Sequence, residues 1–407
     1  MYSPESFNKN NKPDVEAGIK ILRAEQEPDE QSLTEREKNT DKMFDDFLQL
    51  KQGERVLFLI DNNPNNTDPK LIEMMKQRLE ARNIEYDELV ADEETTQRDI
   101  FKKAKKCDLI WASWSMEDTH KSVDFDDLTE FLKGGKENKG GKKVKKEKAR
   151  RMAFCPGVTA EFLDNGGALT EDRKEMEERL GKMEERLKEA VGLRITTSYG
   201  TDLRMKLKRG ERRWFKDAGI IKNGNWDNLP GGEIFTTPDE ESIEGVLVLP
   251  VLQDEVTLDQ GVDKLVHLTI KNGKIRAVDG GISAEKLRKY LKENSINEDD
   301  PESVLQISEI AFGANSKART VANPEGGWDE KDNPVVEKEK RLGTIHLATG
   351  SSKHGEEGTE GHTESDVHLD FVIPRNGLTV ETFDYERDYR SQNNGRKLIN
   401  EGSWNFV

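Results

Sequence analysis

Histidine and carboxylate residues that could bind a metal ion gather in the C-terminal part of the chain. Four of its six histidines fall between positions 346 and 368. In the segment VHLDF, His368 and Asp370 are two residues apart, so on a β-strand both side chains would project from one face. Such a pair can ligate a divalent ion. Taken alone it is a weak signal, because a hydrogen-bonded surface pair is the more frequent arrangement.

Three further donors stand in apolar surroundings. His346 lies in GTIHLATG, Glu309 lies in LQISEIAFG, and Glu233 follows the Pro-Gly-Gly turn of NLPGGEIFTTP. A carboxylate among apolar residues is costly unless a cation or hydrogen-bond donors neutralise it. A lone inward histidine is usually a hydrogen-bonded core residue, so the prediction depends on the whole set. Together with His368 and Asp370, these residues suit a pair of divalent metal ions.

The composition limits the classes of function. The chain has 407 residues, with 64 Lys and Arg against 81 Asp and Glu, a net charge of −17 that disfavours extensive nucleic-acid binding. Residues 133–151 hold ten Lys or Arg and two Glu, and this basic run predicts a solvated loop. We find neither a long apolar segment nor a signal peptide, so we expect a cytoplasmic protein without a membrane partner. The two cysteines, Cys107 and Cys155, fit a reducing compartment, and any metal must be held by oxygen and imidazole ligands.

The elements that must position the donors differ between the two halves of the chain. After a helix predicted at 41–51, apolar strands alternate with helices, a pattern typical of a parallel sheet with crossover helices. The strands are expected at 56–60, 84–90 and 108–113, and the helices at 71–81, 97–106 and 169–192. From about residue 193 short β-prone segments with glycine turns follow, including a hairpin turn at 272–274 and a helix at 284–295.

The predicted fold class is therefore α/β, with a parallel-sheet domain followed by a β-rich α+β domain that binds metal. We expect a polar N-terminal extension over 1–40, an α/β domain over 41–192 that includes the basic run, and the catalytic domain over 193–407. The loop after the first strand, IDNNPNNTDPK, lacks the glycines of a phosphate-binding fingerprint. The first domain is thus predicted to be a scaffold.

At this point the motifs resemble those of the M29-type metalloaminopeptidases, the aminopeptidase T and aminopeptidase S group. NLPGGEIFTTPDEESIEG resembles the segment around the first metal-binding glutamate of that family, and ISEIAFGANSKA resembles its second glutamate motif. GTIHLATG is similar to the first histidine motif, and SDVHLDF to the closing His-x-Asp motif. The resemblance covers about residues 152–373, with the four motifs in family order.

The resemblance implies an aminopeptidase that binds two divalent ions, which could be zinc, cobalt, magnesium or manganese. A water between the ions would attack the first peptide bond of a peptide with a free N-terminus. The implied ligands are Glu233, Glu309, His346, His368 and Asp370, with Glu309 bridging the ions. Glu233, Glu309 and Glu339 are the candidates for a general base. The resemblance also implies a homodimer.

Two departures from the family pattern leave alternatives open. The position of a family tyrosine, seven residues after the first histidine, is Lys353, which stands beside His354. The position of an acidic ligand found in some members is Arg341, with Glu339 two residues before it. One alternative is a ring-cleaving dioxygenase with a single iron, since such enzymes resemble this fold and keep a His-x-Asp ending. Another is a metal-binding homologue without turnover. Retention of both Glu233 and Glu309 favours two metals and hydrolysis.

Overall fold

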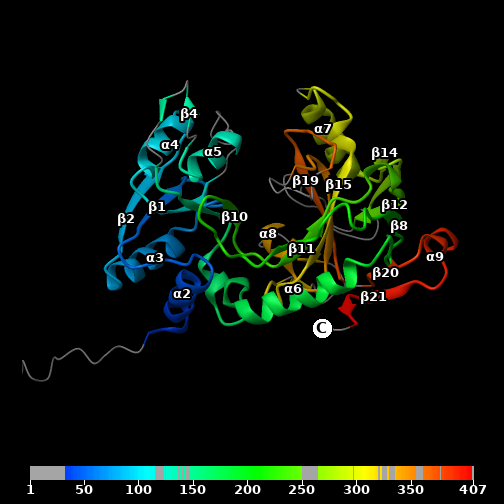
Figure 1. Cartoon of the computed structure of the whole chain (residues 1–407), viewed down its shortest axis with the longest axis horizontal. Helices are drawn as coiled ribbons and strands as arrows, with labels where there is room; N and C mark the ends of the chain where they lie inside the picture. Colours follow the sequence, from blue (N-terminus) through cyan, green and yellow to red (C-terminus); the bar gives the residue numbers. More distant parts are fainter. Residues whose placement is uncertain are drawn as a thin grey trace, which may run out of the picture.

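The computed structural model of the chain has two parts that lie side by side (Figure 1). The predictions for residues 1–32 and for His354 lie outside the described residues. The structure describes residues 33–114, 123, 125–135, 138–139, 142–143, 147–249, 265–296, 298–319, 321–322, 328–329, 335–353, 361–375 and 377–405.

A five-stranded parallel sheet with helices on both faces forms the N-terminal part, as the alternating pattern predicted. Its strands, in spatial order, are β10 (Trp226–Asn228), β6 (Arg151–Phe154), β3 (Leu109–Ser113), β1 (Arg55–Ile60) and β2 (Glu85–Val90). The helices are α2 (Glu35–Asp46), α3 (Pro69–Ala81), α4 (Gln97–Ala104) and α5 (Phe125–Leu132). The edge strand β10 comes from beyond residue 192 and adds a later segment of the chain to this sheet.

Alternation along β1 explains the three layers. Val56 and Phe58 belong to the core that includes residues of α2 and α3, whereas Leu57 and Leu59 belong to the core that includes residues of α4 and α5. Successive side chains of a strand point to opposite faces, so an uninterrupted apolar run is buried on both sides. The segment VLFLI therefore forms a central strand of a covered sheet.

Helix α2 begins at Glu35 rather than near residue 41. Its N-terminus carries a capping box, in which the Thr34 hydroxyl accepts from the Glu37 backbone N–H and the Glu37 carboxylate accepts from the Thr34 backbone N–H. These bonds satisfy two backbone donors that a helix start otherwise leaves unpaired. The charged first turn lacks the apolar periodicity on which the sequence prediction relied.

The prediction of a solvated loop for the basic run is wrong at its C-terminal end. Arg150 and Arg151 are each only 2% exposed. The guanidinium of Arg151 makes two bonds to the Glu54 carboxylate, at 3.0 and 2.6 Å, and donates to the carbonyl of Leu48 at 2.8 Å. Residue 151 opens strand β6, which lies between β10 and β3 in the sheet, so the arginine is buried with its partners. The first part of the run includes the short strands β4 (Asn138–Lys139) and β5 (Lys142–Lys143).

Two antiparallel sheets form the C-terminal part. The first, which we call the site sheet, has five strands in the order β19 (His368–Ile373), β18 (Ile345–Gly350), β15 (Ile307–Gly313), β11 (Glu233–Thr236) and β9 (Phe215–Asp217). The second has eight strands, in the order β14 (Lys274–Asp279), β13 (Val266–Lys271), β12 (Glu244–Leu249), β8 (Asp202–Lys206), β7 (Gly192–Thr196), β20 (Thr379–Phe383), β21 (Arg396–Asn400) and β22 (Ser403–Trp404).

Helices and turns complete this part. They include α6 (Arg173–Leu187), α7 (Ile282–Ser295), α8 (Val335–Lys340), α9 (Glu386–Ser391) and the ribbon of β16 (Val321–Ala322) and β17 (Trp328–Asp329). The predicted hairpin joins β13 to β14, and both Asn272 and Gly273 have positive φ, as a tight two-residue turn requires. In Figure 1, β11, β15, β19 and α8 lie on the side of the C-terminal part that faces the N-terminal part. Within the described ranges, every helix is too short or too polar to cross a bilayer.

Candidate metal centre

The site sheet brings all five predicted ligands to one face. In the ladder, Glu309 and Asp370 lie opposite Ala348, Ala311 and Val372 lie opposite His346, and Glu233 lies opposite Gly313. Residues paired across strands share a face, as do residues two apart on one strand. The side chains of Glu233, Glu309, His346, His368 and Asp370 therefore project from the same side of four neighbouring strands.

Small residues between the donors leave room for them. Ala311, Gly313 and Ala348 occupy the intervening positions on this face, where larger side chains would fill the space above the strands. The next strand, β9, adds Asp217, which lies opposite Glu233 in the ladder. This face of the sheet thus carries a patch of carboxylates and imidazoles with small residues between them.

Three of the donors converge closely enough for one metal ion. One ligand atom from each of Glu309, His346 and Asp370 lies within 4.8 Å of the others. His346 Nε2 is 3.3 Å from Glu309 Oε1, 3.2 Å from Glu233 Oε2 and 3.9 Å from Asp370 Oδ1. A nitrogen and several carboxylate oxygens suit iron, manganese or zinc.

Several buried polar atoms of the cluster lack hydrogen-bond partners among the described residues, as expected for atoms that bind a cation. Asp370 Oδ1, Glu233 Oε2 and His346 Nδ1 are buried, and none makes a hydrogen bond within the described structure. Buried polar atoms are normally paired, so those that are not require a further partner such as an ion or water. The two carboxylate oxygens face His346 Nε2, at 3.2 Å for Glu233 Oε2 and 3.9 Å for Asp370 Oδ1, and a divalent ion among these three atoms would give both oxygens a partner.

His368 lies at the rim of the cluster. Its Nε2 is 3.7 Å from Asp370 Oδ1 and 4.0 Å from Glu309 Oε2, and its side chain is 41% exposed. His346 is by contrast 2% exposed. His368 is therefore the predicted ligand most accessible from solvent, and a small movement of its side chain would bring it to the other donors.

Glu233 spans two positive groups. While its Oε2 faces His346 at 3.2 Å, its Oε1 accepts the ammonium of Lys340 at 2.7 Å. The same Lys340 Nζ lies 2.8 Å from Glu339 Oε1. The lysine side chain is 3% exposed, and its charge is neutralised by these buried carboxylates.

Gly313 allows Lys340 and Glu339 to reach the site sheet. A Cβ at residue 313 would overlap the carbonyl of Arg341 and press on that of Glu339, so only glycine lets the turn after α8 approach β15 this closely. The Asn315 backbone N–H donates to the Lys340 carbonyl at 2.8 Å, and the Thr344 hydroxyl donates to that of Glu339 at 3.2 Å. The backbone that carries both charged residues is therefore fixed.

The electrostatics of the cluster follow from burial and close charges. Burial lowers the pKa of His346, but Glu233 and Glu309 raise it more, so the net pKa lies well above its usual value. Burial raises the pKa of Glu233, but the Lys340 ammonium and His346 bring it below its ordinary range. Burial raises the pKa of Glu339 to about 7, against the effect of Lys340. In the chain without metal, protons on the cluster thus balance part of its negative charge.

Two of the remaining predicted residues lie in the described structure, one inside the cluster and one away from it. Glu339 belongs to the cluster through Lys340. Lys353 forms an ion pair with Glu364 at 3.7 Å, and its side chain is 39% exposed. Arg341 is half-buried, and burial lowers its pKa. Lys353 thus pairs with a glutamate outside the five predicted ligands, at the position where the aminopeptidase family has a tyrosine.

Sequence reasoning missed Lys340 and Asp217. Lys340 ends the charged segment EKEK, which is typical of a solvated helix, and nothing in its spacing indicates burial. Asp217 is buried, with Oδ1 accepting the Gly219 N–H at 2.6 Å, and burial raises its pKa to about 6. The only available signal for Asp217 was its apolar and aromatic company in WFKDAGII, which is a weak one.

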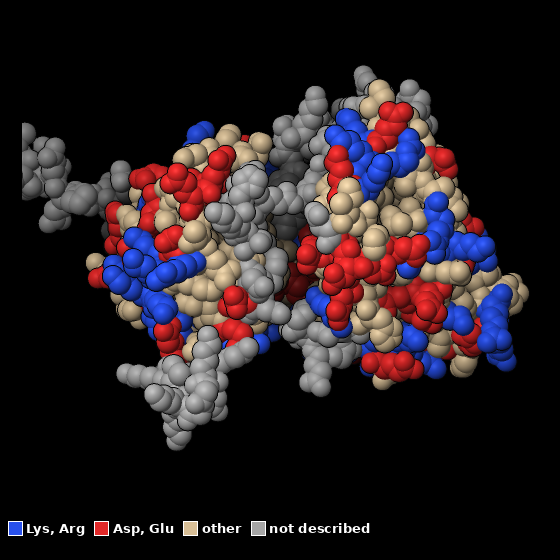
Figure 2. Space-filling model, turned by 90° about the horizontal axis from the view of Figure 1, so that it is seen from above, with Lys and Arg blue, Asp and Glu red and all other residues tan. Residues whose placement is uncertain are grey.

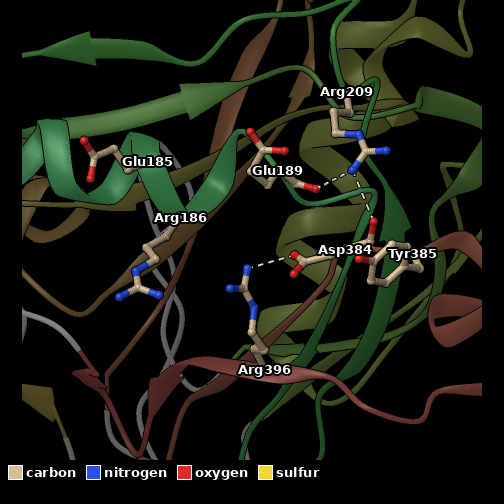
Figure 3. Close-up of a pocket in the computed structure, with 7 residues that line it drawn as sticks. All are labelled: Glu185, Arg186, Glu189, Arg209, Asp384, Tyr385 and Arg396. Carbon is tan, nitrogen blue, oxygen red and sulfur yellow. Dashed lines mark hydrogen bonds and ion pairs between the residues drawn. The ribbon is translucent and has the colours of Figure 1, made fainter.

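A separate cavity of about 410 Å³ lies away from this cluster, between the end of α6, the loop after β8 and strand β21 (Figure 3). Arg396 pairs with Asp384 at 2.8 Å, and Arg209 donates to the carbonyls of Glu189 and Asp384. Charges of both signs line it. It shares no lining residue with the metal-ligand cluster.

Comparison with known proteins identifies the family. The NicX family, described as 2,5-dihydroxypyridine 5,6-dioxygenase, matches residues 47–382. The chain belongs to this family. The NicX match includes the parallel sheet, the site sheet and all five predicted ligands.

The relatives include both dioxygenases and aminopeptidases. The 2,5-dihydroxypyridine 5,6-dioxygenase of Pseudomonas putida is 31% identical over 219 residues, which cover 54% of this chain and 57% of that protein. Aminopeptidase AmpS of Bacillus subtilis is 25% identical over 224 residues, 51% of this chain and 48% of that protein. The matched segments thus span about half the length of each curated relative.

Solved structures share the fold along nearly the whole chain. The 2,5-dihydroxypyridine dioxygenase of Pseudomonas putida KT2440 has a TM-score of 0.61 at 18% identity, covering 92% of this chain and 99% of that one. AmpT of Thermus thermophilus has a TM-score of 0.60 at 15% identity, covering 91% and 99%. The chain therefore has a fold common to NicX and M29-like enzymes, and the resemblance to aminopeptidases holds at the level of that fold.

Proposed function

We propose that this NicX-family chain is a dioxygenase that uses a single iron(II) to open the ring of a dihydroxylated nitrogen heterocycle. Family membership over residues 47–382 and the named activity of the Pseudomonas putida relative support the substrate class. The observation that carries the proposal is the convergence of Glu309, His346 and Asp370 on one position, next to a Glu233 whose other oxygen is held by Lys340. This arrangement favours one divalent ion over two.

The donor types agree with iron(II). Non-haem iron oxygenases hold the metal by histidine and carboxylate and leave other positions open to substrate and oxygen. Iron(II), when bound, supplies the one-electron chemistry that activates dioxygen towards an electron-rich ring. In the overall reaction a ring bond breaks and both oxygen atoms enter the product, so no external reductant is consumed.

The residues of the chain have separate tasks in this proposal. Glu309, His346 and Asp370 hold the ion, and the carboxylates partly neutralise its charge. His368, at the exposed rim, completes the ligand set or accepts a proton from a substrate hydroxyl group. Figure 2 shows a hollow between the two parts of the molecule, with acidic side chains on the C-terminal part beside it. This charge raises the local concentration of cations.

An aminopeptidase is the second candidate, favoured by a specific observation. Both Glu233 and Glu309 are retained within 3.3 Å of His346, more carboxylates than a single iron requires. AmpS and AmpT are also among the relatives. In this alternative two ions would bind and a peptide with a free N-terminus would be hydrolysed. A third alternative is a homologue that binds metal without turnover.

One experiment separates these functions. The purified chain would be stripped of metal and reloaded without oxygen, in separate samples, with iron(II), cobalt(II), zinc(II) or magnesium(II). Oxygen uptake with 2,5-dihydroxypyridine and amine release from leucine p-nitroanilide would then be measured. We expect oxygen uptake equal to the substrate consumed, with iron only. Amine release with cobalt or zinc, without oxygen uptake, would instead support the aminopeptidase. If neither activity is observed, the result would support a homologue that binds metal without turnover.

A further inference from the structure

We propose that the Lys340 ammonium occupies the position of a second metal ion and thereby restricts the centre to one divalent ion. This inference depends on the metal site of the proposed function but not on the reaction performed there. Its starting point is Glu233, whose two oxygens face different cationic positions: Oε2 faces His346 Nε2 at 3.2 Å, and Oε1 accepts from Lys340 Nζ at 2.7 Å.

Glu233 has the arrangement of a bridging carboxylate. In two-metal sites the ions lie about 3.5–4 Å apart, and a bridging carboxylate gives one oxygen to each. One side of Glu233 faces the place where Glu309, His346 and Asp370 converge. The ammonium stands on the other side, where the second ion would lie.

The surroundings of the ammonium are those of a cation site. Besides Glu233, Lys340 Nζ contacts Glu339 Oε1 at 2.8 Å. Asp217 lies opposite Glu233 on the neighbouring strand, and its buried Oδ2 makes no hydrogen bond within the described structure. Three buried carboxylates around one place would suit a divalent ion, but a lysine provides one positive charge and three donors there.

The lysine is part of the fold and cannot easily leave. Its side chain is 3% exposed, and the backbone that carries it is anchored by the Asn315 N–H and by the close approach at Gly313. A divalent ion entering beside the ammonium would be repelled at short range, in surroundings where screening is weak. The centre thus excludes the second ion by a covalently attached charge.

The test compares the natural chain with Lys340→Met, which keeps a similar length but removes the charge. Metal-free protein is titrated with manganese(II), and the bound ions are counted after gel filtration and examined by electron paramagnetic resonance. The natural chain should bind one magnetically isolated ion in the centre. Lys340→Met should bind two, with the altered spectrum of a spin-coupled pair. Spin coupling distinguishes two neighbouring ions in the centre from manganese bound elsewhere on the acidic surface.

Two matched variants control for the substitution. Lys340→Arg keeps a cation and should retain a single isolated ion. Lys338→Met makes the same change at another buried lysine of α8 and should do likewise. A coupled pair in either control would overturn the proposal, because the second ion would then not depend on the charge at residue 340.

Two outcomes with the main samples would also overturn it: a coupled pair in the natural chain, or a folded Lys340→Met that still holds one isolated ion. If Lys340→Met does not fold, the double variant Glu339→Gln/Lys340→Met replaces it, because it leaves the total charge of the buried cluster unchanged. Glu233 and Asp217 remain available as ligands in this variant, and the bound ions are counted and examined by electron paramagnetic resonance in the same way. A natural chain with one ion but no oxygen uptake would reject the proposed reaction and leave the role of Lys340 intact.

Discussion

At the scale of single residues, His346 links the parts of the metal centre. Its Nε2 lies within 3.9 Å of three carboxylates, on Glu233, Glu309 and Asp370. Its burial and its place on β18, an inner strand between β19 and β15, prevent solvent from replacing these contacts. Removal of this imidazole should therefore weaken metal binding more than it destabilises the fold.

We expect His346→Ala to weaken iron(II) binding by more than about 100-fold, the upper end of the loss seen for outer-shell partners of a metal. Oxygen uptake should fall in parallel. Binding would be measured by competition with a coloured chelator. The control is His267→Ala on β13, an exposed histidine outside the cluster, which should bind iron as the natural chain does. Equal affinity of the two variants would remove His346 from the ligand set.

The ligand residues could be found in the sequence because each is polar in an apolar strand. Burial of Glu309 within ISEIAFG or of His346 within TIHLATG requires a partner, and that requirement is local. Lys340 could not be found in this way. Its neighbours are charged, and its burial results from a turn that packs on a distant strand at Gly313. Whether the centre takes one ion or two thus depends on a contact that the sequence pattern does not contain.

At the scale of elements, the turn after α8 depends on the absence of a side chain on β15. We expect Gly313→Ala to destabilise the chain by about 1–3 kcal/mol, as overpacking usually does, because its Cβ would overlap the Arg341 carbonyl. Urea unfolding would measure this. Gly181→Ala, inside helix α6 with open space around it, should instead stabilise by about 0.5–1 kcal/mol. Stabilisation by Gly313→Ala would contradict the packing described here.

The basic run contains charges in two different surroundings. Arg151→Met should destabilise by about 3–5 kcal/mol, since it leaves the Glu54 carboxylate and backbone carbonyls without their buried partner. Lys148→Met removes an ion pair with Asp108 from a side chain that is 47% exposed, and should cost less than about 1 kcal/mol. Thermal unfolding of both variants would compare them. Similar losses would mean that burial does not distinguish these charges.

The elements themselves were largely predictable, and the reasons are physical. The VLFLI and DLIWAS strands and the helices between them follow from apolar runs and periodicity, which local physics determines. The end of the basic run was not predictable, because a charged residue buried by specific partners resembles a solvated one in sequence. The edge strand β10 was also missed, since three residues with no apolar run join the first sheet only through tertiary pairing.

At the scale of the whole molecule, an excess of acidic groups predicts sensitivity to acid, and Glu240 provides a defined test. Its carboxylate accepts from the Thr363 hydroxyl, the His362 backbone N–H and Arg212. Burial raises the pKa of Glu240, but these donors lower it more, to a net value below the usual 4.5. A lowered folded-state pKa contributes stability above the unfolded value, and this is lost as pH falls through the folded value.

We therefore expect Glu240→Gln to be destabilised by about 1–3 kcal/mol at pH 7, the range for a hydrogen-bonded buried charge. The difference from the natural chain should shrink as the pH falls below about 4.5. Urea unfolding between pH 7 and pH 3 would follow it. The exposed neighbour Glu241, changed to Gln, should match the natural chain throughout. A difference that stays constant with pH would show that the charge of Glu240 does not contribute.

The common face of the site sheet has a consequence for how the centre exchanges its metal. The ligands stand on neighbouring strands whose spacing is set by backbone hydrogen bonds, so folding itself brings the ligands together. The apoprotein needs little reorganisation to receive an ion, and loss of the ion leaves the scaffold in place. The centre should therefore load and unload without a folding transition. Because the strand spacing is fixed, the ligands cannot move closer together around an ion that is too small. The protein can therefore select metal ions by their radius.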